Sequence, residues 1–280
     1  MPPHSVSHLS ADELAQSMSF ARICKAVRPG PVRHTILRLN GLAFKEQVII
    51  HGSFRRGYAR IFSNDNSVVI AFRGTRESID WLISNTLALR SPLRDCGPTA
   101  SGVTVHYGFQ RALDYPDKTT GMRSVEALLM HIQRLNLLDR PIFIVGHSLG
   151  GAIATLFAVK FRAAHPSVAN RLLQKVVTFG APAVGGNAFY DYYGDLHERT
   201  TRYVNRADAV PFTPPIGYRH VGREIWLSPN AVRTDMKWPE RLRYALGLGA
   251  QSMGRDHFIA SYIEGLERIT IEPGRSRASL

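Results

Sequence analysis

The chain has 280 residues, of which 44% are hydrophobic and 20% charged, a globular composition that excludes the disordered and fibrous classes. Its two cysteines, Cys24 and Cys96, are too few for a disulfide framework, and neither has a neighbouring cysteine at metal-ligand spacing. The formal net charge of +13 favours contact with anionic surfaces, either lipid or nucleic acid.

The arrangement of the charges favours lipid over nucleic acid, because no basic run of five or more residues and no aromatic-basic platform occurs. The first residues lack the basic start and apolar run of a signal peptide. No stretch approaches the roughly 18 apolar residues of a membrane span. These patterns predict a soluble protein, either cytoplasmic or secreted after trimming of a leader, and they leave localisation and oligomeric state open.

The N-terminal region carries the pattern of a capped helix. Ser10 and Glu13 have the spacing of a capping box. Leu14, Met18 and Ala21 then follow at helical spacing, which predicts a helix over about 11–27. Cys24 falls on the apolar side of this helix, so a buried free thiol is expected rather than a bridge.

Three runs rich in β-forming residues come next, at 48–50, 58–62 and 68–72. The polar cluster at 63–67 predicts a hairpin between the last two runs. Apolar residues at 79, 82, 83 and 87 fit one face of a helix. Residues 91–104 are rich in Pro, Gly, Ser and Thr and are predicted to be a loop.

From about residue 68 onward, predicted strands alternate with predicted helices. This alternation indicates an α/β fold with a mostly parallel sheet covered by helices. Without an internal repeat or a convincing linker, we expect a single domain over 1–280. The further strands are expected at 142–145, 175–179, 201–204 and 223–227, and the further helices at 125–135, 152–164 and 259–266.

The segment Gly146–Gly150 reads G-x-S-x-G and follows a buried strand directly. A serine at this position occupies a tight strand-to-helix turn that exposes its hydroxyl. The turn also places the N–H of Leu149 at a helix N-terminus, where it stabilises a developing oxyanion. An ordinary glycine-rich turn is the competing interpretation. Ser148 is therefore the candidate nucleophile.

Serine needs a base, and imidazole suits this role because it titrates near neutral pH. In this kind of fold the chain order is serine, acid, histidine. His257 lies on a polar, glycine-containing segment just before the last predicted helix and is the favoured base, with His220 as the reserve. Asp208 follows the predicted strand 201–204 and is the favoured acid, whereas Asp191 and Asp195 are less well placed.

These residues resemble the class 3 lipases, the α/β-hydrolase family of the fungal triacylglycerol lipases. The matching blocks extend over roughly residues 58–266. Ala183 and Thr213 depart from the family pattern, which often has Arg and Leu there, and the disulfides of the fungal members have no counterpart. The blocks are Ala71–Thr75, Val105–Phe109, Gly146–Leu156, Thr178–Pro182, Asn205–Pro211 with Pro214 and Pro215, and Asp256–His257.

The resemblance implies that Ser148, Asp208 and His257 form a catalytic triad. It also implies that Thr75 is the second oxyanion residue beside Leu149, and that residues 76–90 form a lid helix. A fixed core helix is the alternative interpretation of that last segment. The expected reaction is acyl transfer from a lipid ester, which needs no metal and no cofactor.

The expected activity is that of a triacylglycerol lipase, with lipid ester as substrate and transient contact with a lipid interface. A phospholipase A1 or short-chain carboxylesterase would use the same triad. A non-catalytic signalling module of the same fold would not react with a fluorophosphonate probe. A nucleic-acid binder, the remaining alternative, would bind DNA with a steep dependence on salt.

Overall fold

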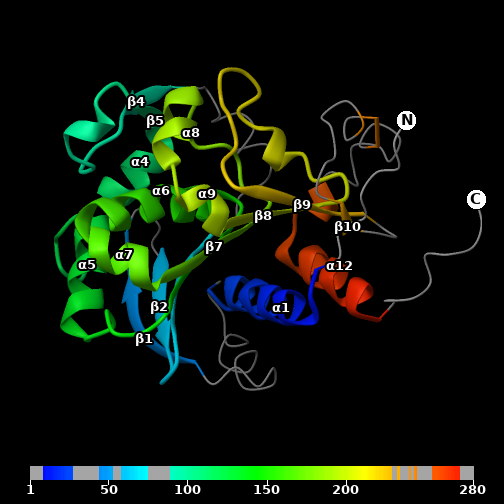
Figure 1. Cartoon of the computed structure of the whole chain (residues 1–280), viewed down its shortest axis with the longest axis horizontal. Helices are drawn as coiled ribbons and strands as arrows, with labels where there is room; N and C mark the ends of the chain where they lie inside the picture. The colour runs from blue at the N-terminus through cyan, green and yellow to red at the C-terminus, as the bar shows by residue number, and fades with distance from the viewer. Residues whose placement is uncertain are drawn as a thin grey trace, which may run out of the picture.

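A computed structural model describes residues 9–27, 44–52, 58–74, 89–228, 232–233, 240, 243–244 and 254–271 of the protein (Figure 1). Within these ranges, eight strands form one sheet in the order β1-β2-β3-β6-β7-β8-β9-β10. Neighbours from β3 to β9 pair in parallel, and β1, β2 and β10 pair antiparallel. The strands are β1 Lys45–Ile50, β2 Ala59–Ser63, β3 Val68–Phe72, β6 Ile142–His147, β7 Leu173–Phe179, β8 Thr200–Asn205, β9 Arg223–Leu227 and β10 Val232–Arg233.

Helices cover both faces of the sheet, which confirms the predicted α/β class. Figure 1 shows α1 and α12 side by side on one face, while the other helices lie on the opposite side. The α-helices are α1 Ala11–Ala26, α4 Tyr107–Asp114, α5 Ser124–Arg134, α6 Leu149–Ala164, α7 Pro166–Leu172, α8 Asn187–Tyr193, α9 Leu196–Arg199 and α12 Ile259–Ile271. Two short 3-10 helices are η1 Pro98–Ala100 and η2 Val210–Phe212.

The continuous apolar runs of the central strands supply both halves of the core. Successive side chains of a strand point to opposite faces, so a run without polar residues buries both faces. In β3, Ile70 and Phe72 belong to the core on the α6 side, and Val69 and Ala71 belong to the core beneath α1 and α12. The sheet is therefore enclosed between two apolar layers.

The N-terminal helix begins at the capping box. Ser10 Oγ accepts a hydrogen bond from the Glu13 N–H at 3.1 Å, and the Glu13 carboxylate accepts one from the Ser10 N–H at 3.2 Å. Leu14, Met18 and Ala21 are buried against the sheet. These contacts explain why α1 starts at Ala11.

The hairpin predicted around 63–67 is confirmed, with Ala59 of β2 opposite Phe72 of β3. The prediction that 91–104 is entirely loop is wrong. Strand β4, Arg90–Pro92, pairs antiparallel with β5, Thr104–His106. Strands of three residues are too short to show a hydrophobic period. The high content of Pro and Gly in this segment therefore led to the prediction of a loop. The helix expected at 79–87 lies outside the described residues.

Cys24 is a buried free thiol, as the sequence predicts, and Cys96 is a buried free thiol as well. Within the described part of the chain, no helix combines the length and the apolar character that a membrane crossing requires.

Asp117 organises the connection between α4 and α5 from a nearly inaccessible position. Its carboxylate accepts hydrogen bonds from the N–H groups of His51 at 2.7 Å, Thr119 at 3.2 Å and Thr120 at 2.9 Å, and from the Thr120 hydroxyl at 2.9 Å. Burial alone would raise the pKa of Asp117, but these donors outweigh it and hold the pKa below its usual value.

We expect Asp117→Ala to lower the free energy of unfolding by about 2 kcal/mol, because partly buried N–H groups lose a charged acceptor. The folded pKa lies below the unfolded value of roughly 3.9. The stabilisation should therefore be present above that pH and disappear as the pH falls through the folded pKa. Urea denaturation of both proteins at pH 7 and near pH 2 measures this, and a difference that does not shrink in acid would contradict it.

Candidate active site

The nucleophile candidate sits in a strained turn between a strand and a helix. Strand β6 ends at His147, and α6 begins at Leu149. Ser148 between them has φ 59° and ψ −132°, a conformation that side-chain-bearing residues rarely adopt. Such strain costs on the order of 1–3 kcal/mol and is typical of functional sites.

Two glycines make this turn sterically possible. A Cβ on Gly146 would lie 2.2 Å from the carbonyl oxygen of Gly150, and a Cβ on Gly150 would lie 2.3 Å from that of Phe72. Both distances are far below van der Waals contact. The sequence G-x-S-x-G is therefore the steric requirement for α6 to start directly against β3 and β6.

Ser148, His257 and Asp208 meet at the carboxyl ends of β6 and β8. His257 Nε2 lies 2.8 Å from Ser148 Oγ, and His257 Nδ1 lies 2.9 Å from Asp208 Oδ2. Ser148 is 3% exposed, His257 7% and Asp208 0%. The three sequence-predicted residues are thus within hydrogen-bonding distance in the order that a serine, its base and the base-orienting acid require.

The segments that carry the acid and the base are bonded to each other. The carboxylate of Asp256 accepts a hydrogen bond from the Ala207 N–H at 3.1 Å, and Asn205 Nδ2 donates to the Asp256 carbonyl at 3.0 Å. Burial raises the pKa of Asp256. These contacts fix the spacing between Asp208 and His257 independently of the nucleophile.

Two residues that contact the triad were not singled out from the sequence. His147 Nε2 lies 2.6 Å from the carbonyl oxygen of His257, and the two imidazole ring centres are 4.9 Å apart. The hydroxyl of Tyr262 donates to Asp208 Oδ2 at 2.5 Å. The position of His147 inside the elbow motif was a usable signal, whereas Tyr262 lies on a helix whose direction only the fold defines.

The oxyanion candidates are described in part. Leu149 is the first residue of α6, so its N–H lies at the positive end of the helix. Thr75 and residues 76–88 of the expected lid lie outside the described residues. A Cβ on Gly74 would be 3.2 Å from Ser148 Cβ. The chain therefore passes against the nucleophile one residue before Thr75.

The alternative base and the two alternative acids lie outside the contacts of Ser148. His220 Nε2 lies 2.6 Å from the carbonyl oxygen of Pro211, and it remains outside the triad. Asp191 is an exposed residue of α8. The carboxylate of Asp195 accepts a hydrogen bond from Arg162 at 2.7 Å. None of the three is a member of the Ser148 cluster.

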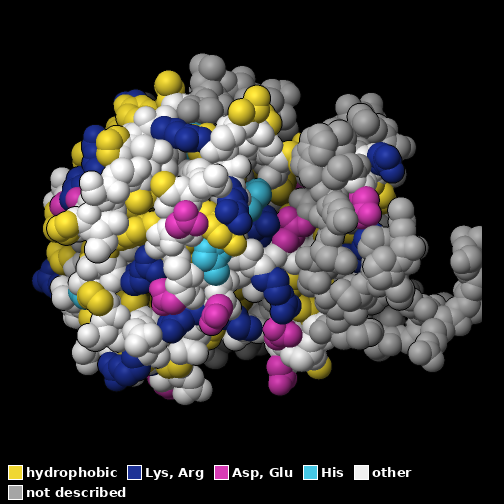
Figure 2. Space-filling model, turned by 45° about the horizontal axis from the view of Figure 1, so that its top comes forward, with side chains coloured by type: hydrophobic (Ala, Val, Ile, Leu, Met, Phe, Trp, Pro, Cys, Tyr) yellow, Lys and Arg dark blue, Asp and Glu magenta, His cyan; other side chains and the backbone are white. Residues whose placement is uncertain are grey.

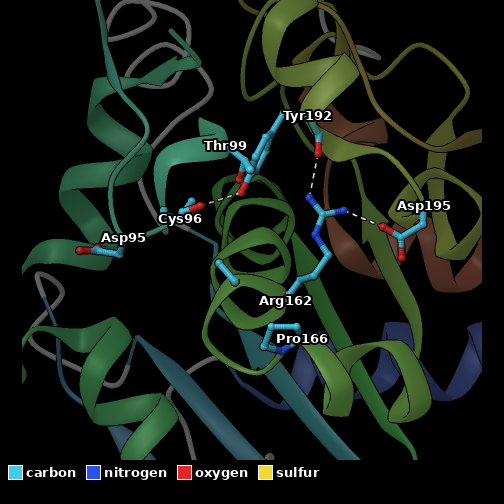
Figure 3. Close-up of a pocket in the computed structure, with 9 residues that line it drawn as sticks. Asp95, Cys96, Thr99, Arg162, Pro166, Tyr192 and Asp195 are labelled. Atoms are coloured by element: carbon cyan, nitrogen blue, oxygen red, sulfur yellow. Dashed lines mark hydrogen bonds and ion pairs between the residues drawn. The ribbon is translucent and has the colours of Figure 1, made fainter. Parts of the chain in front are cut away.

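A separate cavity of about 440 Å³ opens near the far end of α6 (Figure 3). Arg162 lies 14 residues after Ser148 on α6, roughly 20 Å away at 1.5 Å per residue. Its guanidinium binds the Asp195 carboxylate, and the Tyr192 hydroxyl donates to the Cys96 carbonyl at 3.1 Å. These polar groups are hydrogen-bonded to one another across the cavity, which lies between the loop after β4 and helix α8. Because of its distance from Ser148, the cavity is separate from the Ser148, His257 and Asp208 cluster. Its lining is Asp95, Cys96, Gly97, Thr99, Arg162, Ala163, Pro166, Tyr192 and Asp195.

The basic residues do not form a continuous stripe on the face drawn in Figure 2. Lys and Arg side chains there are scattered among acidic and hydrophobic ones. A face that follows a nucleic-acid backbone needs clustered positive charge. Among the described residues on this face, the positive charge is not clustered in that way.

Comparison with known sequences identifies one family. The sequence profile described as lipase (class 3) matches residues 69–218. Phospholipase A1-II 2 of Oryza sativa subsp. indica is 31% identical over 176 residues, which are 56% of this chain and 44% of that protein. The lipase of Rhizomucor miehei is 30% identical over 173 residues, covering 61% of this chain and 44% of its own length. The matches thus span less than half of these relatives.

Solved structures agree on the architecture. Lipase II from Rhizopus niveus superposes with a TM-score of 0.70 at 20% sequence identity, over 90% of this chain and 95% of that one. At this level of identity the likeness establishes the fold, which is that of the α/β hydrolases.

Proposed function

The chain belongs to the class 3 lipase family, whose profile matches more than half of its residues, and we propose that it hydrolyses carboxylic esters of lipids, with triacylglycerol as the first candidate substrate. The observation that carries the proposal is the continuous contact from Ser148 Oγ to His257 Nε2 at 2.8 Å and from His257 Nδ1 to Asp208 at 2.9 Å. A hydroxyl that faces a base, itself oriented by a buried carboxylate, is an activated nucleophile.

In the proposed acylation step, Ser148 Oγ attacks the carbonyl carbon of the ester while His257 Nε2 accepts the hydroxyl proton. Asp208 holds the imidazole with Nε2 free and stabilises the imidazolium. The tetrahedral intermediate collapses when His257 gives the proton to the leaving alkoxide. Water then attacks the acyl-enzyme with His257 again as the base, which releases the acid and restores Ser148.

The negative charge of the intermediate needs donors that are already in place. The Leu149 N–H at the start of α6 is one donor, helped by the helix dipole. Thr75 is assigned as the second donor from the family resemblance alone, and residues 76–90 are proposed as a lid on the same basis. Each step is supplied by protein groups and water.

Exposed apolar side chains support lipid as the substrate. Phe258 follows the base directly and is 55% exposed, and Ile216 is 83% exposed on the loop that follows η2. The Tyr107 N–H donates to the carbonyl of Leu89, a residue that is itself 64% exposed. Such side chains lose unfavourable contact with water when they reach an acyl-chain surface.

A phospholipid ester is the second candidate substrate, because basic residues accompany these apolar ones. Arg255 is exposed three residues before Phe258, and Arg219 is exposed three residues after Ile216. A basic residue near an anionic membrane contributes about 1 kcal/mol to binding. The similarity to plant proteins named phospholipase A1 supports the same candidate.

A substrate panel tests the proposal. We expect the purified chain to react covalently with a fluorophosphonate at one serine and to hydrolyse a short activated ester. Rates on a triacylglycerol emulsion and on phospholipid vesicles then decide between the two lipid classes. A chain that neither reacts with the probe nor cleaves any ester would contradict the proposal and favour a non-catalytic module of this fold.

A matched pair of variants tests whether surface charge contributes to the binding of phospholipid. Arg255→Gln should weaken binding to vesicles of anionic phospholipid about fivefold, the equivalent of about 1 kcal/mol. Arg171→Gln, an exposed change on α7, is the control and should leave binding unchanged. Equal binding of all three proteins would remove the electrostatic argument for phospholipid without affecting the ester hydrolase assignment.

A further inference from the structure

The carboxylate of Asp208 is surrounded by hydrogen-bond donors. Oδ1 accepts the Val210 N–H at 2.9 Å and lies 3.0 Å from His257 Nδ1. Oδ2 lies 2.9 Å from the same nitrogen and accepts the Tyr262 hydroxyl at 2.5 Å. Asp208 and Tyr262 are both fully buried. A hydrogen bond to a charged acceptor in such a setting is among the stronger ones in proteins.

Tyr262 contacts Asp208 from helix α12, on the face of the sheet that α1 and α12 cover. It lies on α12, five residues after His257, and its ring packs edge-on against Phe179 of β7 at 5.9 Å between centres. Burial, followed by the charge of Asp208, raises the pKa of Tyr262 well above its ordinary value. The phenol therefore stays protonated and remains a donor throughout the working pH range.

A neighbouring tyrosine shows what a purely structural hydroxyl looks like in this core. Tyr203 on β8 is 1% exposed and stacks on Phe179, the residue that also contacts Tyr262. Its hydroxyl pairs with the Ser17 hydroxyl at 2.6 Å, a neutral partner on α1. A buried tyrosine in this core can therefore pack and satisfy its hydroxyl with a neutral partner. Tyr262 instead donates its hydroxyl to a carboxylate.

We propose that Tyr262 is a positioning residue of the triad: its hydroxyl fixes the Asp208 carboxylate and takes up part of its negative charge. The inference rests on the proposed ester hydrolysis. Tyr262 acts through Asp208 and His257 and does not touch the ester. Because the carboxylate shares its charge with the phenol, it holds the imidazolium of His257 less strongly than it otherwise would.

Other ionisable groups face this cluster and are unchanged in the test below. His147 on β6 lies against the His257 ring. Asp256 lies beside the base, with Arg206 Nε 3.8 Å from its carboxylate and the charge of Arg255 also acting on it. Arg202 on β8 is a buried guanidinium whose electrostatic environment includes Tyr262.

The test compares Tyr262→Phe with Tyr203→Phe, two changes that each remove one buried hydroxyl from the same core. We expect Tyr262→Phe to lower kcat on a short activated ester about tenfold, with KM within about twofold, since the acid is less well oriented. The pH at which kcat/KM falls to half on the acid side should rise by roughly half a unit. Without the phenol hydrogen bond, the Asp208 carboxylate carries more negative charge and stabilises the imidazolium more strongly. Tyr203→Phe should keep the wild-type kcat and pH profile.

Site-specific 3-fluorotyrosine at 262 keeps the fold even if the phenylalanine variant does not. Its hydroxyl is a stronger donor, so the acid limb should move to lower pH. An unchanged acid limb and kcat in Tyr262→Phe, with a loss of stability like that of Tyr203→Phe, would overturn the proposal. An unchanged limb with fluorotyrosine would overturn it equally.

A readout without turnover separates this proposal from the proposed function. The imidazole of His257, labelled with ¹⁵N, can be titrated by NMR in the wild type and in Tyr262→Phe. If neither protein cleaves esters but the titration midpoint rises in the variant, the ester hydrolase assignment fails and the role of Tyr262 stands. If both proteins cleave esters with the same midpoint, the role of Tyr262 fails alone.

Discussion

Replacement of Ser148 by alanine should lower kcat on a carboxylic ester by about six orders of magnitude. The covalent route disappears with the hydroxyl, and the remaining rate comes from the oxyanion donors and substrate binding alone. Alanine also has a Cβ, so the left-handed φ of 59° is as strained in the variant as in the wild type. We therefore expect a folded protein with little change in thermal stability.

The measurement is hydrolysis of a short activated ester by protein prepared free of wild-type enzyme, together with labelling by a fluorophosphonate. Ser167→Ala, an exposed change on α7, is the matched control and should retain full activity and full labelling. A Ser148→Ala protein with even a tenth of the wild-type rate would show that another group is the nucleophile.

Asp208→Asn should lower kcat by about four orders of magnitude, since the wrong imidazole tautomer is then favoured. The Val210 N–H requires an acceptor at Oδ1, so the asparagine oxygen takes that place. The amide NH₂ then occupies the Oδ2 position and faces both the Tyr262 hydroxyl and His257 Nδ1. Nδ1 becomes the acceptor, and Nε2 carries the proton where Ser148 needs a base.

Asp191→Asn is the matched control for this change, because Asp191 was the alternative acid and is exposed on α8. It should leave kcat within about twofold. Equal losses from the two variants would mean that Asp208 has no special role, and a large loss from Asp191→Asn alone would move the acid to α8. Circular dichroism of each protein confirms that it is folded.

The sequence was most informative where a chemical requirement restricts the residue. The buried strand 142–145 followed by Gly146, Ser148 and Gly150 predicted the elbow, because a Cβ on either glycine would lie only 2.2 or 2.3 Å from a backbone oxygen. The order of serine, acid and base predicted three residues that the fold brings into contact across 109 positions of the chain. Hydrophobic periodicity, apolar runs and turn residues together predicted the alternation of strands and helices.

Features that depend on the packing of one element against another could not be predicted. Strands β4 and β5 are three residues each, so their pairing has no sequence signature. Tyr262 lies on an amphipathic segment far along the chain from the acid, and its hydrogen bond to Asp208 spans 54 positions. Which tyrosine meets the acid follows from the angle at which α12 crosses the sheet, and that angle is a tertiary property.

The bond from His147 to the backbone of residue 257 has a mechanical consequence. His147, the residue before Ser148, is hydrogen-bonded to the backbone carbonyl of His257. The Asp256 carboxylate is hydrogen-bonded to the Ala207 N–H, beside Asp208. Hydrogen bonds thereby connect the turn at Ser148 with the segments that carry His257 and Asp208. We therefore expect the spacing between Ser148, His257 and Asp208 to stay constant when a ligand binds beside them.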